Sequence, residues 1–343
     1  NHVEPCSYNN KLILPLTVNE TVSQHIYRKN PKTKKEIIKG QQSDGITNVI
    51  QTGEVATEVL KDVFTDVNIY ENYIRILQHP FVSPIGETAI SFYRYYIADT
   101  VYVDRDLCYH LQFLPNNQQD FGFRGDLYVL ADSTLHVKRC DLTIPKKSDV
   151  NFVESMKIEQ VFTKLPNGEW ALTTDNMIAE MKLSNLLSKA ICVRTTRLSD
   201  YSFDEIPKKL FSGKAKVKRE IEAMNRDKAF WSKYRTVELT KAESTMDNFM
   251  RRMEQSKNYK WVITGAKALI ENFVETSADK DKNKFDIGPV NTLISSNFVD
   301  GIRLRASGRT SAHLNPHLFW TGFYAYGTKS HKHYYSSEIT YSF

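Results

Sequence analysis

Three arginines near the C-terminus are the residues of this 343-residue chain that are best placed to do chemistry. Arg303, Arg305 and Arg309 stand an even number of residues apart, so an extended strand would place them on one face. Ile302 and Leu304 would point the other way. A guanidinium group stays protonated and binds carboxylates and phosphates, so this face is suited to attract anions or to line a polar pore. We therefore take the three arginines as candidate lumen-facing residues, with plain solvent exposure as the alternative.

Histidines offer the other candidate chemistry, because imidazole is a common metal ligand. His331 and His333 would lie on one side of a strand, and His313 and His317 flank a turn. Each pair lacks a third ligand at a metal-binding spacing, so we expect no metal site. The chain also lacks the sequence patterns of serine hydrolases, zinc proteases, phosphate-binding loops and dinucleotide folds. We therefore expect no catalytic and no cofactor-binding residues, and a protein that is not an enzyme.

The arginines belong to a series of strand-like segments that runs to the end of the chain. Residues 301–312 alternate polar and apolar side chains over about 10–12 residues, the length of a tilted strand that crosses a bilayer. Aromatic residues crowd the segment ends, as in the girdles of outer-membrane barrels. A soluble antiparallel sheet with an aromatic core fits the same period. The other strands are expected at residues 260–271, 285–295, 317–327 and 334–343, with polar connections at 277–284 and 328–333.

Several runs of the sequence carry a resemblance to a known family. The runs are DVNIYENY (66–73), SPI (83–85), FYRYY (92–96), NFV (151–153), KFDIGPV (284–290), SSNFVDGIRLR (295–305), GRT (308–310), FYAYG (323–327) and EITYSF (338–343). With these runs the chain resembles Bacteroidetes-type outer-membrane proteins of unknown function. In that family, a carboxypeptidase-regulatory-like domain precedes a large conserved β-rich region and a surface-antigen-like β-barrel.

The resemblance implies a location and an architecture rather than an activity. It places the chain in the outer membrane of a Gram-negative bacterium with a periplasmic portion, and it carries over no catalytic residues. The chain begins at Asn1 without a signal peptide or regulatory-like domain, and it holds about five barrel-type strands where a single-chain barrel needs at least about eight. We therefore expect an internal fragment, cut at both ends.

Composition and charge set further bounds. A chain of this length with 41% hydrophobic residues can bury two cores, and no apolar run reaches the about 18 residues of a transmembrane helix. A β-barrel is not excluded, since its alternating strands have average hydropathy. The net charge is +6, with the densest basic stretches at 29–39 and 208–219. Such stretches are typical of solvated faces, with contact to anionic lipid or nucleic acid as the alternative.

The four cysteines, Cys6, Cys108, Cys140 and Cys192, show no paired spacing and no spacing to histidine that suits a metal. We expect buried free thiols, with a disulfide in an oxidising periplasm as the alternative.

The first 200 residues are expected to be mostly β-structure. Residues 1–45 are predicted to be extended with a turn at Asn30 and Pro31, and residues 48–64 have the apolar spacing of a short amphipathic helix. Strands follow one another about every 10–12 residues over 91–198, with a turn at Asn167 and Gly168, which predicts one curved antiparallel sheet. The side chains expected to be buried in it are Phe152, Ile158, Phe162, Trp170 and Leu172.

Two uses of this sheet remain open. The arrangement is similar to the periplasmic lipoprotein-carrier type, an open half-barrel that can hold an acyl chain; in the alternative, its concave face packs its own core or a helix.

Residues 200–257 are expected to be helical. Thr240 and Glu243 have the spacing of a capping box, and an apolar stripe follows at Met246, Phe249, Met250 and Met253.

The sequence thus predicts a mainly β fold: a curved antiparallel sheet of periplasmic type, a short helical connector, and the first strands of an incomplete transmembrane β-barrel. We expect a lead-in segment at 1–90, an antiparallel β domain at 91–199, a helical connector at 200–257 and about five barrel strands at 258–343. The expected role lies in transport, translocation or envelope assembly, with outer-membrane lipid, envelope proteins or an acyl chain as partners and without nucleic acid. The alternative is a soluble periplasmic binding or interaction module.

Overall fold

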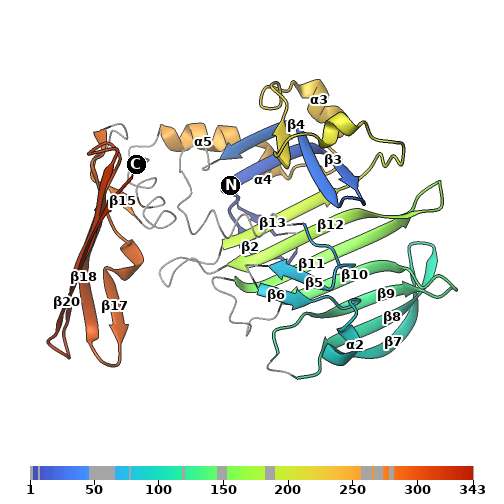
Figure 1. The fold of residues 1–343 in the computed structure, drawn as a ribbon, viewed down its shortest axis with the longest axis horizontal. Helices are drawn as coiled ribbons and strands as arrows, with labels where there is room; N and C mark the ends of the chain where they lie inside the picture. The colour runs from blue at the N-terminus through green and yellow to red at the C-terminus, as the bar shows by residue number, and fades with distance from the viewer. Residues whose placement is uncertain are drawn as a thin grey trace. The chain divides into compact units, whose positions relative to one another are not determined.

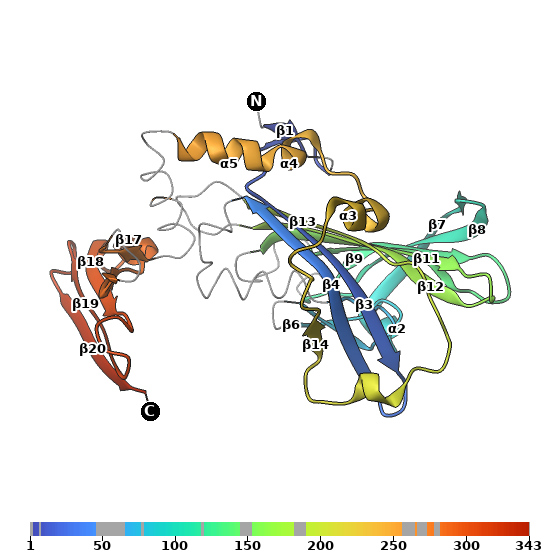
Figure 2. The same cartoon turned by 90° about the horizontal axis from the view of Figure 1, so that it is seen from above.

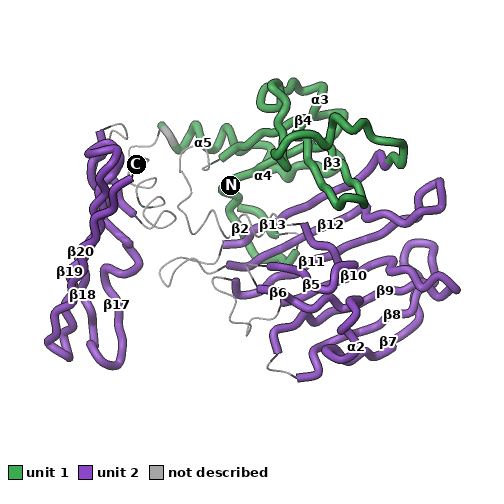
Figure 3. The backbone as a smooth tube through the Cα atoms, in the orientation of Figure 1, with its two compact units in different colours: residues 1–52, 202–268 green, residues 53–201, 269–343 purple. Residues whose placement is uncertain are grey.

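The computed structural model describes residues 3–6, 8–45, 66–76, 79–117, 120–144, 153–181, 190–255, 265, 273–277 and 282–342. These residues form mostly antiparallel sheets with a few short helices, which confirms the predicted mainly β fold. The helix predicted at 48–64 lies outside the described residues, as does all but Gly265 of the strand predicted at 260–271. The chain divides into two compact units, residues 1–52 with 202–268 and residues 53–201 with 269–343 (Figure 3).

Seven strands of the second unit form one antiparallel sheet in which each strand pairs with the next along the chain (Figure 1). This meander confirms the sheet predicted over 91–198. The connection at Asn167 and Gly168 also forms, because Gly168 takes a φ of +90° and Leu165 bonds to Glu169 across the turn. The strands are β7 (Tyr93–Val103), β8 (Asp106–Pro115), β9 (Arg124–Leu130), β10 (Val137–Ile144), β11 (Val153–Lys164), β12 (Trp170–Met181) and β13 (Ala190–Arg197).

One face of this sheet holds the largest core of the described residues. Along β11, Met156, Ile158 and Phe162 are buried at every second or fourth position, as the period-two pattern predicts. Trp170 and Leu172 are half-buried rather than fully buried, since they lie at the start of β12, near the turn. Phe152 lies outside the described residues.

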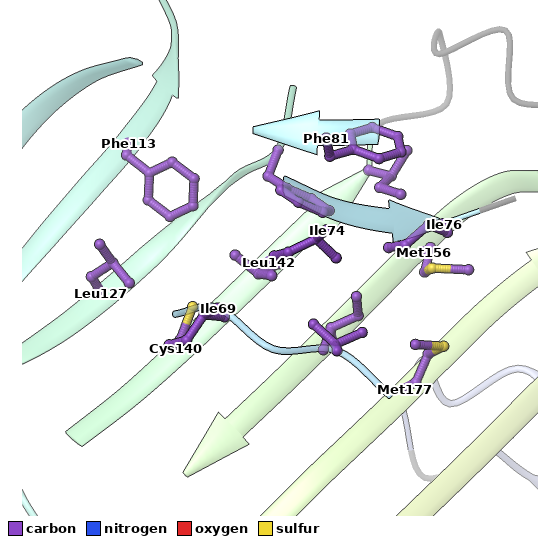
Figure 4. Packing of buried hydrophobic residues seen from close by; sticks show 14 of the residues in the cluster. Ile69, Ile74, Ile76, Phe81, Phe113, Leu127, Cys140, Leu142, Met156 and Met177 are labelled. Carbon is purple, nitrogen blue, oxygen red and sulfur yellow. The ribbon is translucent and has the colours of Figure 1, made fainter. Parts of the chain in front are cut away.

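The same face is covered by the chain segment that precedes the sheet. Strands β5 (Tyr73–Ile76) and β6 (His79–Val82) form a hairpin, followed by the short helix α2 (Ala89–Phe92). Ile76 and Phe81 of the hairpin are buried against the sheet (Figure 4). The Phe81 and Phe123 rings stack with their centres 4.8 Å apart. Each buried side chain of this size contributes roughly 1.5–3 kcal/mol. The sheet therefore packs a core made from its own chain.

The first unit is built on a long hairpin of β3 (Thr17–Arg28) and β4 (Thr33–Gly45), preceded by the short strands β1 (Glu4–Pro5) and β2 (Leu12–Ile13). The turn predicted at Asn30 and Pro31 joins the two long strands. A third strand, β14 (Val217–Arg219), pairs in parallel with β4, with Val217 opposite Glu36. Residues about 180 apart in the chain thus share one small sheet.

Residues 200–257 are helical only in their second half, so the prediction of a helical segment is wrong for residues 200–227. Those residues contain a 3₁₀ turn, η2 (Lys208–Phe211), and β14, because Pro207 and Gly213 interrupt helical hydrogen bonding and β4 offers an open strand edge. The helices that do form are α3 (Lys228–Tyr234), α4 (Lys241–Ser244) and α5 (Met246–Glu254). The predicted capping box is confirmed, because Thr240 and Glu243 make both of its reciprocal hydrogen bonds.

The C-terminal residues form a six-stranded antiparallel sheet. The strand predicted at 285–295 is wrong as one element: it is broken at Pro289, which has no N–H group, and a 3₁₀ turn, η4 (Val290–Thr292), follows. The strands predicted at 301–312, 317–327 and 334–343 and the turn at 328–333 are confirmed. The strands are β15 (Val274–Glu275), β16 (Phe285–Ile287), β17 (Ile294–Asn297), β18 (Gly301–Thr310), β19 (Leu318–Gly327) and β20 (His333–Tyr341).

Among the described residues, no helix is long and apolar enough to cross a bilayer.

Candidate functional site

The three candidate arginines lie together on one face of the C-terminal sheet. Strand β18 places Arg303, Arg305 and Arg309 on the face that β19 supplies with Phe323 and Ala325, since directly opposed residues share a face. All three arginines are half-buried. The sequence-derived expectation that they share a face is thus confirmed, while their position in a lumen stays a prediction.

Each guanidinium group lies over an aromatic ring. The guanidinium carbon is 4.6 Å from the ring centre of Tyr334 for Arg303 and 3.8 Å from that of Phe323 for Arg305. Arg309 lies 3.9 Å from the ring centre of Phe273, and its Nε bonds to the Asp286 carboxylate at 3.2 Å. Such cation–π contacts hold a charged group in place while leaving its other side open to water or an anion.

The opposite face of the same sheet is apolar and exposed. Ile302 and Leu304 of β18 are 53% and 48% exposed, and Ile339 of β20 is 68% exposed. Among residues on this face, Tyr324 and Tyr335 are also exposed. In an ordinary half-buried sheet of a soluble protein, the apolar face is the covered one. Here the apolar face is open and the arginine face is the more covered of the two.

A shallow groove runs across the apolar face where β17 meets β18 and β19. It is lined mainly by apolar and aromatic side chains from these strands and from the residue before β17: Leu293, Ile294, Leu304, Ala306, Tyr324 and Tyr326. Exposed apolar surface of this kind is typical of sites that contact a protein or a membrane.

Asp300 fixes the turns at one end of the sheet, and the sequence reading did not single it out. It is 4% exposed and accepts hydrogen bonds from Ser330 Oγ at 2.7 Å and Tyr334 Oη at 2.8 Å. A third bond comes from Asn297 Nδ2 at 3.2 Å. These hydrogen bonds favour the charged carboxylate and so lower the pKa of Asp300 below its usual value, with the bond from Ser330 having the largest effect. The sequence does mark a turn here, because Asp300 is followed by Gly301, and Asp-Gly is a typical turn pair. In the structure Gly301 takes a φ of +67°.

The histidines pair with tyrosines on the apolar face. Tyr324 Oη lies 2.5 Å from His333 Nδ1, and Tyr326 Oη lies 2.9 Å from His331 Nδ1. His317 contacts the carbonyl oxygen of Ser342 at 3.0 Å. Within the part of the chain that the structure describes, no group of three histidine, cysteine or carboxylate side chains is arranged to hold a metal.

A charged network crosses the outer face of the seven-stranded sheet. Asp126, Asp141 and Glu159 stand directly opposite one another on β9, β10 and β11, an arrangement that repels unless it is neutralised. Arg139 neutralises it by binding both oxygens of Asp141 at 3.1 and 3.0 Å and Glu159 at 2.8 Å. His110 contacts Asp126 at 2.7 Å. The paired charges tie four strands together, which is a structural role.

The four cysteines are free, and all but Cys192 are buried. Burial raises the pKa of the Cys140 thiol well above its usual value, and burial likewise raises the pKa of the Cys108 and Cys192 thiols. A thiol with a raised pKa is a poor nucleophile, because the thiolate is the reactive form. These residues therefore act as small apolar core residues.

Comparison with known proteins gives one match. Residues 10–196 match the model of a family of unknown function (DUF5686). No curated protein and no solved structure matches the chain.

Proposed function

Because the chain belongs to the family of unknown function DUF5686, which brings no activity with it, we propose its role from its surfaces: it forms part of a Gram-negative outer-membrane β-barrel protein of the Bacteroidetes type. Residues 285–342 contribute strands to the barrel wall, and the seven-stranded sheet belongs to a periplasmic region. The protein acts in transport, translocation or envelope assembly, with no catalytic site.

The main support for this proposal is that the apolar face of the C-terminal sheet is exposed while its arginine face is the more buried one. Ile302, Leu304 and Ile339 are roughly half or more exposed on one face, while the arginines of the other face are half-buried. Contiguous apolar surface of this kind marks a contact with lipid or protein, since water makes it unfavourable. In a barrel wall it faces hydrocarbon.

The arginine face fits the wet interior of such a barrel. Its side chains include Ser336, Glu338 and Thr340 of β20 as well as the three arginines of β18. A row of fixed positive charges there attracts anions, which gives the lumen a preference for negatively charged solutes or segments.

The resemblance to Bacteroidetes-type outer-membrane proteins adds a domain order to the proposal. In proteins of that type a carboxypeptidase-regulatory-like domain precedes the β-rich region, and we propose the same order for the whole protein. Envelope proteins are the proposed partners of the periplasmic region. We propose no acyl-chain site on the seven-stranded sheet, because in the described residues the β5–β6 hairpin covers its core face.

Cell fractionation of the full-length protein tests the proposal. We expect it in the outer-membrane fraction, retained there after washes with high salt and alkaline carbonate, which remove proteins held by surface charge alone. The variant Leu304→Arg should reduce the retained amount, because an arginine near the bilayer midplane costs roughly 2–4 kcal/mol. The matched variant Ser307→Arg adds the same residue on the arginine face and should be retained. Recovery of the wild-type protein in the soluble periplasmic fraction would favour the soluble module instead.

A further inference from the structure

The positive charge of the chain is concentrated in two short runs of the first unit. Residues 28–39 hold six basic residues and one acidic residue, and residues 207–219 hold six basic residues and no acidic one. Together they carry +11, whereas the whole chain carries +6, so the remaining residues carry −5. The sequence places the two runs about 180 residues apart, but the fold joins them.

Three contacts bring the runs together at the end of the β3–β4 hairpin. Strand β14 pairs in parallel with β4 over Val217–Arg219. Lys35 Nζ donates to the carbonyl oxygens of Ser212 and Gly213 at 2.5 and 2.9 Å. The Arg28 guanidinium carbon lies 4.4 Å from the centre of the Phe211 ring, and Figure 2 shows the segment after β13 passing the hairpin end.

Arg28 and Lys35 make these contacts and Lys39 is half-buried, while the other nine basic side chains of the two runs are exposed. We call these exposed residues the basic surface: Lys29, Lys32, Lys34, Lys208, Lys209, Lys214, Lys216, Lys218 and Arg219. Apolar side chains are interspersed among them, with Tyr27 56%, Leu210 38% and Val217 53% exposed.

We propose that the basic surface binds the anionic headgroups of a phospholipid membrane. Eight of its nine cations are lysines, which act as point charges toward phosphate, whereas sequence recognition in nucleic acids favours the planar, bidentate arginine. The interspersed Tyr27, Leu210 and Val217 can enter the boundary between headgroups and acyl chains while the ammonium groups remain at phosphate depth. The inference goes beyond the barrel and does not depend on it, since the basic surface belongs to the other compact unit.

Vesicle cosedimentation of the full chain tests this surface. The probes are phosphatidylcholine vesicles with and without phosphatidylglycerol, and the variant is Lys214→Glu with Lys216→Glu and Lys218→Glu. We expect the wild-type protein to prefer the anionic vesicles and to lose that preference as salt rises. The triple variant should bind anionic vesicles roughly tenfold or more weakly, because each lysine near a charged surface contributes several-fold. The corresponding glutamine variant should fall between the two.

The control variant makes the same change in net charge elsewhere, with Lys164→Glu, Lys228→Glu and Lys241→Glu at three exposed positions. It should bind as the wild-type protein does, and circular dichroism with thermal unfolding should show that all variants are folded. Equal loss in the two glutamate variants would overturn the proposal. So would equal wild-type binding to neutral vesicles, which would point to the apolar C-terminal face, or binding to a duplex oligonucleotide in preference to anionic vesicles.

Discussion

The guanidinium carbon of Arg305 lies 3.8 Å from the centre of the Phe323 ring, on the neighbouring strand of the C-terminal sheet. This contact accounts for how Arg305 can be half-buried in the sheet although no described carboxylate forms an ion pair with it. We predict that Phe323→Leu, which keeps an apolar side chain but removes the ring, lowers the free energy of unfolding by about 0.5–2 kcal/mol. The measurement is urea unfolding of the protein in detergent micelles.

A double-variant cycle isolates this contact. In an Arg305→Gln background, the same Phe323→Leu change should have a clearly smaller effect, because the cation is already gone. An equal loss in the two backgrounds would show that Phe323 acts by packing alone.

Asp300 predicts a dependence of stability on acid pH. Its folded-state pKa is lowered from 3.8 by its hydrogen bonds, so the stability that it contributes is present above that value and is lost as the pH falls through the folded pKa. Unfolding free energies measured at decreasing pH below 3.8 should therefore fall more steeply for the wild-type protein than for Asp300→Asn. At neutral pH the variant should be the less stable of the two. Parallel pH curves would contradict this role.

A buried ion pair is predicted to matter in the seven-stranded sheet. Arg194 Nη2 lies 2.7 Å from Asp175 Oδ2, and the side chains are 10% and 7% exposed. Removing one partner of a buried pair typically costs about 3–5 kcal/mol, so Arg194→Met should be strongly destabilising in urea unfolding. Combining it with Asp175→Leu should recover part of the loss. If the two losses simply added, the residues would not be coupled.

The β5–β6 hairpin is predicted to be an integral part of the sheet's core. Phe81 is fully buried, and Phe81→Ala should lower the free energy of unfolding by about 3–5 kcal/mol, since it leaves a cavity against Phe123. Tyr73, on the same hairpin, is 54% exposed, and Tyr73→Ala should change stability by about 0.5 kcal/mol or less. Similar losses for the two variants would mean that the hairpin does not pack as described.

Local pattern predicted much of this fold, because most of the strands pair with their neighbours along the chain. The alternation in β11 and β18, the turn at Gly168 and the capping box of Thr240 all depend on residues close in sequence. The prediction of one strand over 285–295 gave too little weight to Pro289.

Contacts between distant residues could not be read from the sequence. The pairing of β14 with β4 and the covering of the sheet by residues 66–76 and 79–92 depend on which open edge or apolar face is available after folding. For the site, periodicity placed three arginines on one face, but not the rings of Tyr334, Phe323 and Phe273 over which they lie. Period alone also cannot say which face of a strand is covered.

Labelling of an introduced cysteine in the full-length protein in cells tests the membrane assignment most directly. Cysteine is introduced at Leu304 or at Arg305, neighbours on β18 that point to opposite faces, and the unsubstituted protein sets the background from its native thiols. If β18 spans the outer membrane, position 304 reacts with a lipid-soluble thiol reagent and is shielded from a water-soluble one, while position 305 shows the opposite preference. Equal reaction of the two positions with both reagents, or no reaction at 304 with either, would contradict the assignment.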